Sequence, residues 1–261
     1  MALTNEQRRH VADVLREAEL NRIPVEPISG TYPTMDIEDA YAIQTINIER
    51  RLLAGATIVG RKVGLTGAKM QDMHGLNQYD YGVLLDDMVE QVGGSVDISR
   101  FCTPRVEIEI AFLLAQPLVG PGVTAADVRA ATQAVAPAIE LIDSRIVDWR
   151  ISLVDTIADN ASSCGLALGP WSPLGDLSLP DVRAELIIDG EVVCDGTGAD
   201  VMGDPAESVA WLANTCATYG LHLEAGQIVL TGSCTRAVDV RPGSQVEGLF
   251  TDLGSVTLNF E

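Results

Sequence analysis

The chain has 261 residues and a mass of 27.8 kDa, and 47% of its residues are hydrophobic, enough for a sizeable core. Its 17 Lys+Arg against 37 Asp+Glu give a net charge of −20, so the surface should repel phosphate backbones and anionic lipid. We therefore expect no nucleic-acid partner and no membrane partner, and the longest apolar runs are far shorter than the ~20 residues of a membrane span.

The N-terminal residues and the cysteines indicate a cytoplasmic protein. Residues 1–10 lack the apolar stretch of a secretory signal, and Glu6 is unlike an acid-poor transit peptide. The five cysteines are odd in number, scattered and without a Cys-x-x-Cys pair, which is typical of reduced thiols. They are Cys102, Cys164, Cys194, Cys216 and Cys234.

Two amphipathic helices are predicted near the N-terminus. The first spans residues 4–22, with Thr4 and Gln7 forming a capping box and Pro24 ending it. The second spans residues 36–54 and ends at Gly55. We therefore expect a helical N-terminal portion, residues 1–75, packed on a core of residues 76–261.

Beyond Gly60 the pattern changes to short alternating runs separated by Gly, Pro and Asp. The runs predict strands at 106–114, 184–188, 191–194, 227–230 and 254–260, and helices at 125–135 and 205–219. Asp189-Gly190 between two strands is a hairpin signal, and the elements do not alternate as βαβα. These features favour an α+β fold with a mostly antiparallel sheet.

Three glutamates are candidate metal ligands. Glu107 and Glu109 are two residues apart on a predicted strand, so their side chains share one face; that face could also be an ordinary solvated one. Glu140 has apolar neighbours on both sides, where an unpaired carboxylate would be costly to bury. Three converging carboxylates suit Mg²⁺ or Mn²⁺, whereas three unpaired histidines make zinc a poorer choice.

Lys62 is one of only two lysines and stands beside Arg61 in an apolar run flanked by glycines. Strand alternation would place the two cations on opposite faces, so one could point inward. An inward Lys62 near carboxylates could donate a proton or stabilise an enolate, while an outward one would be an ordinary surface side chain.

Two loops add further candidates. Asp80 lies between aromatic residues in 78–82, and Asn160, Ser162 and Ser163 lie in a small-residue segment. Asp80 could be a simple turn residue, and Asp159-Asn160 a helix cap or an Asx-turn. The sequence contains no Gly-x-Ser-x-Gly, Gly-x-Gly-x-x-Gly or phosphate-binding loop.

Taken together, these segments resemble the 2-keto-4-pentenoate hydratases, also called 2-hydroxypenta-2,4-dienoate hydratases, of the fumarylacetoacetase superfamily. The resemblance covers nearly the whole chain. Its motifs lie at residues 59–66, 78–82, 104–112, 138–146, 155–162, 203–205, 210–214 and 230–233.

The resemblance implies a mixed, mostly antiparallel β-roll core and a Mg²⁺- or Mn²⁺-dependent lyase that hydrates a 2-hydroxydienoate in the meta-cleavage degradation of aromatic compounds. It also implies a homo-oligomer, with association to the downstream aldolase as a further expectation. Matched residue by residue, Glu107, Glu109 and Glu140 correspond to metal ligands, and Lys62, Asp80 and Ser162 to positions that line the substrate.

Other activities stay open at this point. Decarboxylation of 2-oxo-3-hexenedioate (4-oxalocrotonate) on the same scaffold would need a group for a second carboxylate, for which Arg145 and Arg150 are candidates. C–C bond hydrolysis would need a His–Glu dyad, for which His74 is the nearest histidine. A further alternative belongs to a different functional class: a non-enzymatic acidic protein that binds a partner or stores cations.

Overall fold

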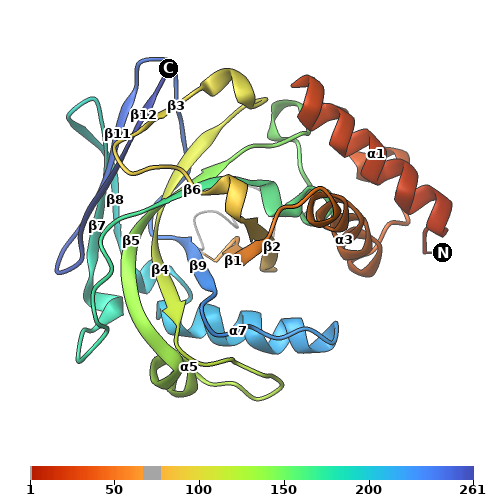
Figure 1. Cartoon of the computed structure of the whole chain (residues 1–261). Coiled ribbons are helices and arrows are strands. Elements are labelled where there is room, and N and C mark those ends of the chain that lie inside the picture. The colour runs from red at the N-terminus through yellow and green to blue at the C-terminus, as the bar shows by residue number, and fades with distance from the viewer. Residues whose placement is uncertain (1, 67–77) are drawn as a thin grey trace.

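The structure is a computed structural model that describes residues 2–66 and 78–261 (Figure 1). Its helices are α1 (Asn5–Asn21), α2 (Ile28–Thr31), α3 (Ile37–Leu53), α5 (Ala125–Ala131), α6 (Leu153–Ala158) and α7 (Pro205–Thr218). Its short 3₁₀ helices are η1 (Asp86–Met88), η2 (Ile98–Arg100), η3 (Val147–Trp149), η4 (Asn160–Ser162), η5 (Leu179–Asp181) and η6 (Gly198–Asp200).

Twelve strands are described. They are β1 (Ile58–Gly64), β2 (Asp80–Leu85), β3 (Ser95–Val96), β4 (Arg105–Leu114), β5 (Thr132–Ile142), β6 (Ser163–Leu168), β7 (Arg183–Ile188), β8 (Glu191–Thr197), β9 (Ile228–Ser233), β10 (Val238–Asp239), β11 (Gln245–Phe250) and β12 (Gly254–Phe260).

The N-terminal helices begin where the capping signals predict. The Thr4 hydroxyl accepts from the Gln7 N–H at 3.2 Å, and the Gln7 side chain accepts from the Thr4 N–H at 2.8 Å. Asp36 caps α3 in the same way. Helix α1 packs on α3, and α3 packs on α6, which places α6 between the helical layer and the sheet (Figure 1).

Two sheets form the core, and both are mixed but mostly antiparallel. The larger has the order β2-β1-β9-β4-β5-β6, with β10 added beside β4, and its β1–β9 pair is parallel. The smaller has the order β3-β12-β11-β7-β8, with a parallel β12–β3 pair. The predicted hairpin at Asp189-Gly190 joins β7 to β8. The α+β prediction is confirmed.

The larger sheet curls into a roll, because β2 and β6, at opposite ends of its strand order, contact each other. The smaller sheet packs on the outside of this roll (Figure 1), where Ile108 lies close to Gly248; a Cβ at Gly248 would come within 2.9 Å of Ile108. Inside, small and aliphatic side chains such as Ala111, Ala138 and Leu230 form a separate apolar cluster.

One prediction is wrong. The helix expected over residues 125–135 ends at Ala131, and Thr132 begins the long strand β5. The Ala-rich pattern continues past the end of the helix, but β5 pairs with β4 on one side and β6 on the other, and these ladders outweigh local helix propensity.

The expected boundary between residues 75 and 76 lies outside the described residues. Within the first segment, β1 is a central member of the larger sheet, parallel to β9. Residues 1–75 therefore contribute a strand to the core besides the helices packed on it. No helix among the described residues has the length and apolar character needed to cross a membrane.

Candidate metal centre and active site

Three carboxylates converge on the inner face of the roll. Glu107 on β4 stands directly opposite Glu140 on β5, and Glu109 follows Glu107 on the same face. One oxygen from each of the three carboxylates lies within 4.8 Å of the other two. Glu107 is 6% exposed, and Glu109 and Glu140 are 0% exposed. The alternative of a solvated acidic face is therefore wrong.

Several of these oxygens have no hydrogen-bond donor among the described residues. Glu109 Oε2 accepts from the Gly232 N–H at 2.7 Å, but Glu109 Oε1 and both oxygens of Glu140 accept none. Buried carboxylates without donors are costly, and a hard divalent cation is the partner that oxygen-only ligands suit. Among the described residues, no histidine or cysteine joins the cluster, and its three carboxylates fit such a cation far better than zinc.

Burial and repulsion between the carboxylates raise the pKa values of this cluster. Burial, followed by the charge of Glu140, raises the pKa of Glu107 to about 7. The same two causes raise the pKa of Glu109 well above its ordinary value. Burial also raises the pKa of Glu140, although the nearby Lys62 ammonium acts in the opposite direction. A cation would replace protons at this site as it binds.

Lys62 lies on β1 and points toward the cluster. Its side chain is 4% exposed, and Nζ lies 3.5 Å from Glu140 Oε2 and donates to the Ala161 carbonyl at 2.9 Å. Burial alone would lower the pKa of Lys62, but the charges of the surrounding carboxylates, Glu140 foremost, raise it above its usual value. The outward alternative is wrong, and Lys62 is held as a buried ammonium.

Asp80 begins β2 and is buried beside Lys62, so the turn interpretation is wrong. Its Oδ2 accepts from the Thr156 hydroxyl at 3.2 Å, and that hydroxyl lies 3.5 Å from Ser162 Oγ. Gly64 makes room for this carboxylate, because a Cβ there would lie 2.1 Å from Asp80 Oδ1. Burial raises the pKa of Asp80, partly offset by Lys62.

A pocket opens at these side chains. It brings together four predicted residues, Lys62, Asp80, Glu107 and Ser162. The remaining lining was not predicted and is mostly apolar: Gly64, Leu65, Ile142, Trp149, Ile151, Thr156 and Ala161. Thr156 lies in a family-like segment, but nothing in its spacing distinguished it, and apolar lining residues carry no chemical signal in a sequence.

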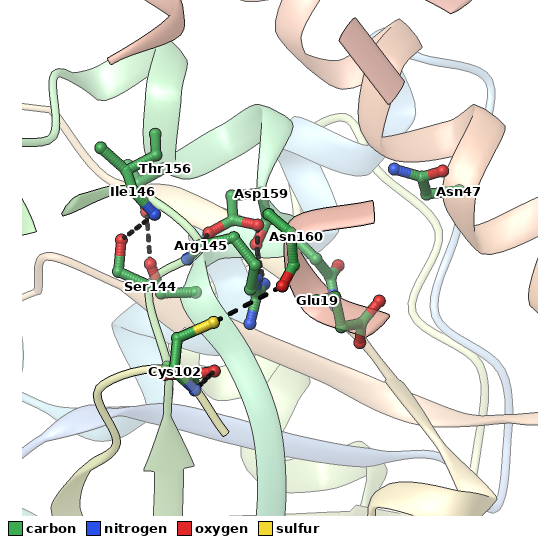
Figure 2. Close-up of polar contacts among 12 residues, drawn as sticks. Glu19, Asn47, Cys102, Ser144, Arg145, Ile146, Thr156, Asp159 and Asn160 are labelled. Carbon is green, nitrogen blue, oxygen red and sulfur yellow. Dashed lines mark hydrogen bonds and ion pairs between the residues drawn. The ribbon is translucent and has the colours of Figure 1, made fainter. Parts of the chain in front are cut away.

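The two arginines considered for a second carboxylate lie elsewhere. Arg145 is buried and paired with Asp159, its Nε donating to Asp159 Oδ1 at 2.6 Å (Figure 2). Arg150 is half exposed and paired with Glu26 at 2.7 Å. Asp159 is the C-cap residue of α6, which agrees with the helix-cap interpretation of Asp159-Asn160. His74 lies outside the described residues.

Fold and site together are those of an enzyme with a buried cluster of carboxylates that could hold a divalent cation. Residues 72–260 match the model of the fumarylacetoacetate (FAA) hydrolase C-terminal family. The chain belongs to the FAA hydrolase family, and its similarity to the 2-keto-4-pentenoate hydratases extends over its whole length.

Three relatives illustrate this. The chain is 42% identical to the 2-keto-4-pentenoate hydratase of Paraburkholderia xenovorans, with 99% of this chain and 97% of that protein covered. It is also 42% identical to the 2-oxo-hept-4-ene-1,7-dioate hydratase of Escherichia coli, over 96% of each. The solved structure of 4-oxalocrotonate decarboxylase from Pseudomonas putida G7, complexed with magnesium and adipate, superposes with a TM-score of 0.94 at 38% identity and 99% coverage of both chains.

Proposed function

We propose that the chain is a hydro-lyase that adds water to 2-hydroxypenta-2,4-dienoate, or a close alkyl homologue, to give 4-hydroxy-2-oxopentanoate in meta-cleavage degradation of aromatic compounds. The observation that carries the proposal is the buried cluster of Glu107, Glu109 and Glu140 beside the Lys62 ammonium, in a pocket whose remaining lining is mostly apolar. The hydratase names of full-length relatives support it.

Glu107, Glu109 and Glu140 would hold Mg²⁺ or Mn²⁺, since all three ligands are carboxylates. When bound, the cation would act as a Lewis acid that stabilises negative charge on the substrate. Solved relatives contain magnesium, calcium or manganese, which supports a divalent ion.

The reaction moves one proton from the C2 hydroxyl to C5 and then adds water across C3 and C4. Lys62 is suited to stabilise negative charge at C2, because its raised pKa keeps the ammonium protonated at neutral pH. Asp80 is suited to carry the proton, because burial raises its pKa toward neutral pH. Ser162, 3.5 Å from the Thr156 hydroxyl, can position a carboxylate or water.

Decarboxylation of 2-oxo-3-hexenedioate is the second candidate, favoured by the similarity to the solved decarboxylase. That substrate carries a distal carboxylate, which calls for a cation or amide group in the pocket. Among the described lining residues, Lys62 is the single cation, and it is already engaged with Glu140 and Ala161. The apolar remainder supports the monocarboxylate dienoate.

The test is a side-by-side assay of pentadienoate, hexadienoate and 2-oxo-3-hexenedioate with Mg²⁺ or Mn²⁺, following loss of dienoate absorbance. We expect hydration of a dienoate to dominate, and Lys62→Ala and Glu107→Gln each to lose about 100-fold or more in kcat. Glu185→Gln, at an exposed position on β7, is the matched control. Near wild-type rates in Lys62→Ala would contradict the assignment, and absence of both turnover and stoichiometric metal binding would favour a non-enzymatic acidic protein.

We also propose a cytoplasmic homo-oligomer that associates with the downstream aldolase. The five cysteines are all unpaired, in keeping with a reducing compartment. Large apolar side chains stand exposed at Leu20, Ile23 and Leu53, and contacts between subunits would cover such groups. Native mass measurement, alone and with the aldolase, tests both associations.

A further inference from the structure

The segment η4 has an uncommon backbone. Asn160, Ala161 and Ser162 have φ values of 55°, 50° and 57°, three consecutive residues in the left-handed region without a glycine. Non-glycine residues pay a steric cost there, and such runs persist only where their surroundings impose them. This run lies between α6 and β6 and borders the pocket through Ala161 and Ser162.

Asn160 fastens this segment to β2. Its Oδ1 accepts from the Val83 N–H at 2.8 Å, and its Nδ2 donates to the Val83 carbonyl at 3.0 Å. Strand β2 is an edge strand of the larger sheet, so the Asn160 amide pairs with the side of β2 that faces away from β1. Gly82 allows the approach, because a Cβ there would lie 2.4 Å from the Asn160 carbonyl oxygen.

Both flanks of the segment are anchored as well. The Asp159 carboxylate accepts from Arg145 Nε and from the Arg145 N–H at 2.9 Å, and Arg145 Nη2 donates to the Asp159 carbonyl at 2.6 Å. Figure 2 shows Arg145 and Asp159 pointing toward one another, with Asn160 next to them. At the other flank, the Asp143 N–H donates to the Ser162 carbonyl at 2.8 Å.

The anchored segment sets the position of Lys62. The Ala161 carbonyl accepts from Lys62 Nζ at 2.9 Å, whereas the nearest carboxylate oxygen among the described residues, on Glu140, lies 3.5 Å away. The carbonyl is therefore the short contact that fixes the direction of the ammonium. The same segment holds the Ser162 hydroxyl near that of Thr156.

We propose that Asn160 is a positioning residue: its side-chain amide holds the left-handed segment 160–162 against β2, so that the Ala161 carbonyl aims the Lys62 ammonium and Ser162 faces the pocket. Asn160 does not itself line that pocket. The consequence for turnover rests on the proposed function, whereas the consequence for Lys62 does not.

The variant Asn160→Gly removes the amide and keeps a residue that tolerates positive φ. Asn214→Ala is the matched control. Asn214 Oδ1 accepts from the Val123 N–H at 2.9 Å, and its Nδ2 donates to the Val123 carbonyl at 2.9 Å, the same two-point contact, here made from α7. Its Oδ1 also accepts from the Gly122 N–H at 2.7 Å, so this variant loses at least as many hydrogen bonds as Asn160→Gly. Alanine is the residue that a helix tolerates best.

The first readout is independent of activity. Lys62 is one of two lysines, so its reductive methylation can be followed by peptide mass spectrometry in the metal-free protein. We expect modification of Lys62 to be at least about fivefold faster in Asn160→Gly than in wild type and unchanged in Asn214→Ala, since a lost hydrogen bond frees the amine. Equal rates in Asn160→Gly and wild type would overturn the proposal.

The second readout is the split between kcat and KM on the dienoate. Asn160→Gly should lose about 10- to 100-fold in kcat with KM within about threefold, and Asn214→Ala should stay within about twofold for both. Equal losses in the two variants would indicate a merely structural role and overturn the proposal.

Should Asn160→Gly not fold, Asn160→Asp replaces it. This variant keeps the acceptor for the Val83 N–H and should give smaller shifts in the same directions. Lack of turnover in wild type, with Lys62 labelling as expected, would reject the proposed function and leave the positioning role standing.

Discussion

Lys62 Nζ lies 3.5 Å from Glu140 Oε2, although β1 and β5 are separated by β9 and β4 in the larger sheet. The curl of the roll brings the two side chains together inside it. The ammonium therefore neutralises part of the charge of a carboxylate cluster that would otherwise repel itself, and it competes for that charge with any cation bound there.

This competition makes a prediction for Lys62→Met, which keeps the length of the side chain and removes its charge. The affinity for Mn²⁺, measured by calorimetry, should stay the same or rise, because a neighbouring positive charge is lost. In contrast, kcat on the dienoate should fall about 100-fold or more. Loss of both together would show that Lys62 supports the metal centre and has no separate role in turnover.

A second prediction concerns Gly64. A Cβ at this position would lie 2.1 Å from Asp80 Oδ1 and 3.3 Å from Lys62 Nζ, so Gly64→Ala must displace the Asp80 carboxylate. We expect kcat/KM to fall about tenfold or more, with a loss of about 1–3 kcal/mol in the free energy of unfolding.

Gly30→Ala is the control for this experiment, since a Cβ at Gly30 meets nothing within 4 Å. It should leave kcat/KM and the unfolding midpoint nearly unchanged. Wild-type turnover in Gly64→Ala would mean that the position of Asp80 does not matter for the reaction.

The third prediction is a pH dependence. The folded state raises the pKa of Glu107 from 4.5 to about 7, so it binds a proton that the unfolded state releases. The free energy of unfolding of the metal-free protein should therefore fall as pH rises from about 4.5 to about 7, by on the order of 3 kcal/mol from this group. Because a cation must displace that proton, its affinity should rise with pH, by up to about tenfold per pH unit below pH 7 from this group.

Urea unfolding of chelator-treated protein and Mn²⁺ titrations between about pH 5.5 and pH 8.5 measure the two effects. Glu107→Gln, which cannot ionise, should flatten the dependence of stability on pH. Equal cation affinity at both ends of this range would contradict the raised pKa.

Much of the fold follows from local sequence signals. The capping residues Thr4 and Asp36 mark the starts of α1 and α3, and alternating runs mark most strands. Strand β5 was missed because its Ala-rich start continues the pattern of α5, and only its pairing with β4 and β6 decides its conformation. Pairing of this kind is set by tertiary structure and is not encoded in a short window.

The candidate site was predicted partly from residue spacing and partly from the family resemblance. Spacing placed Glu107 and Glu109 on one face, but the position of Glu140 opposite Glu107 depends on the β4–β5 register. The choice of Lys62 and Asp80 came from the family resemblance, since their sequence context also allowed surface and turn readings. Asn160 was noted as a candidate in a small-residue segment, with a helix cap or an Asx-turn as the alternative. No positioning role was predicted, because its contact with Val83 joins segments 77 residues apart.

The last prediction concerns substrate range and uses Ile151, one of the apolar residues that line the pocket. Ile151→Arg would supply a cation for a distal carboxylate, so it should shift the ratio of kcat/KM toward 2-oxo-3-hexenedioate over pentadienoate by about tenfold or more. Ile151→Met, a similarly sized apolar change, is the control and should shift the ratio by less than about threefold. Parallel assays of both variants and wild type measure these ratios. If the methionine and arginine variants shift the ratio equally, packing at this position, and not charge, determines which substrate is accepted.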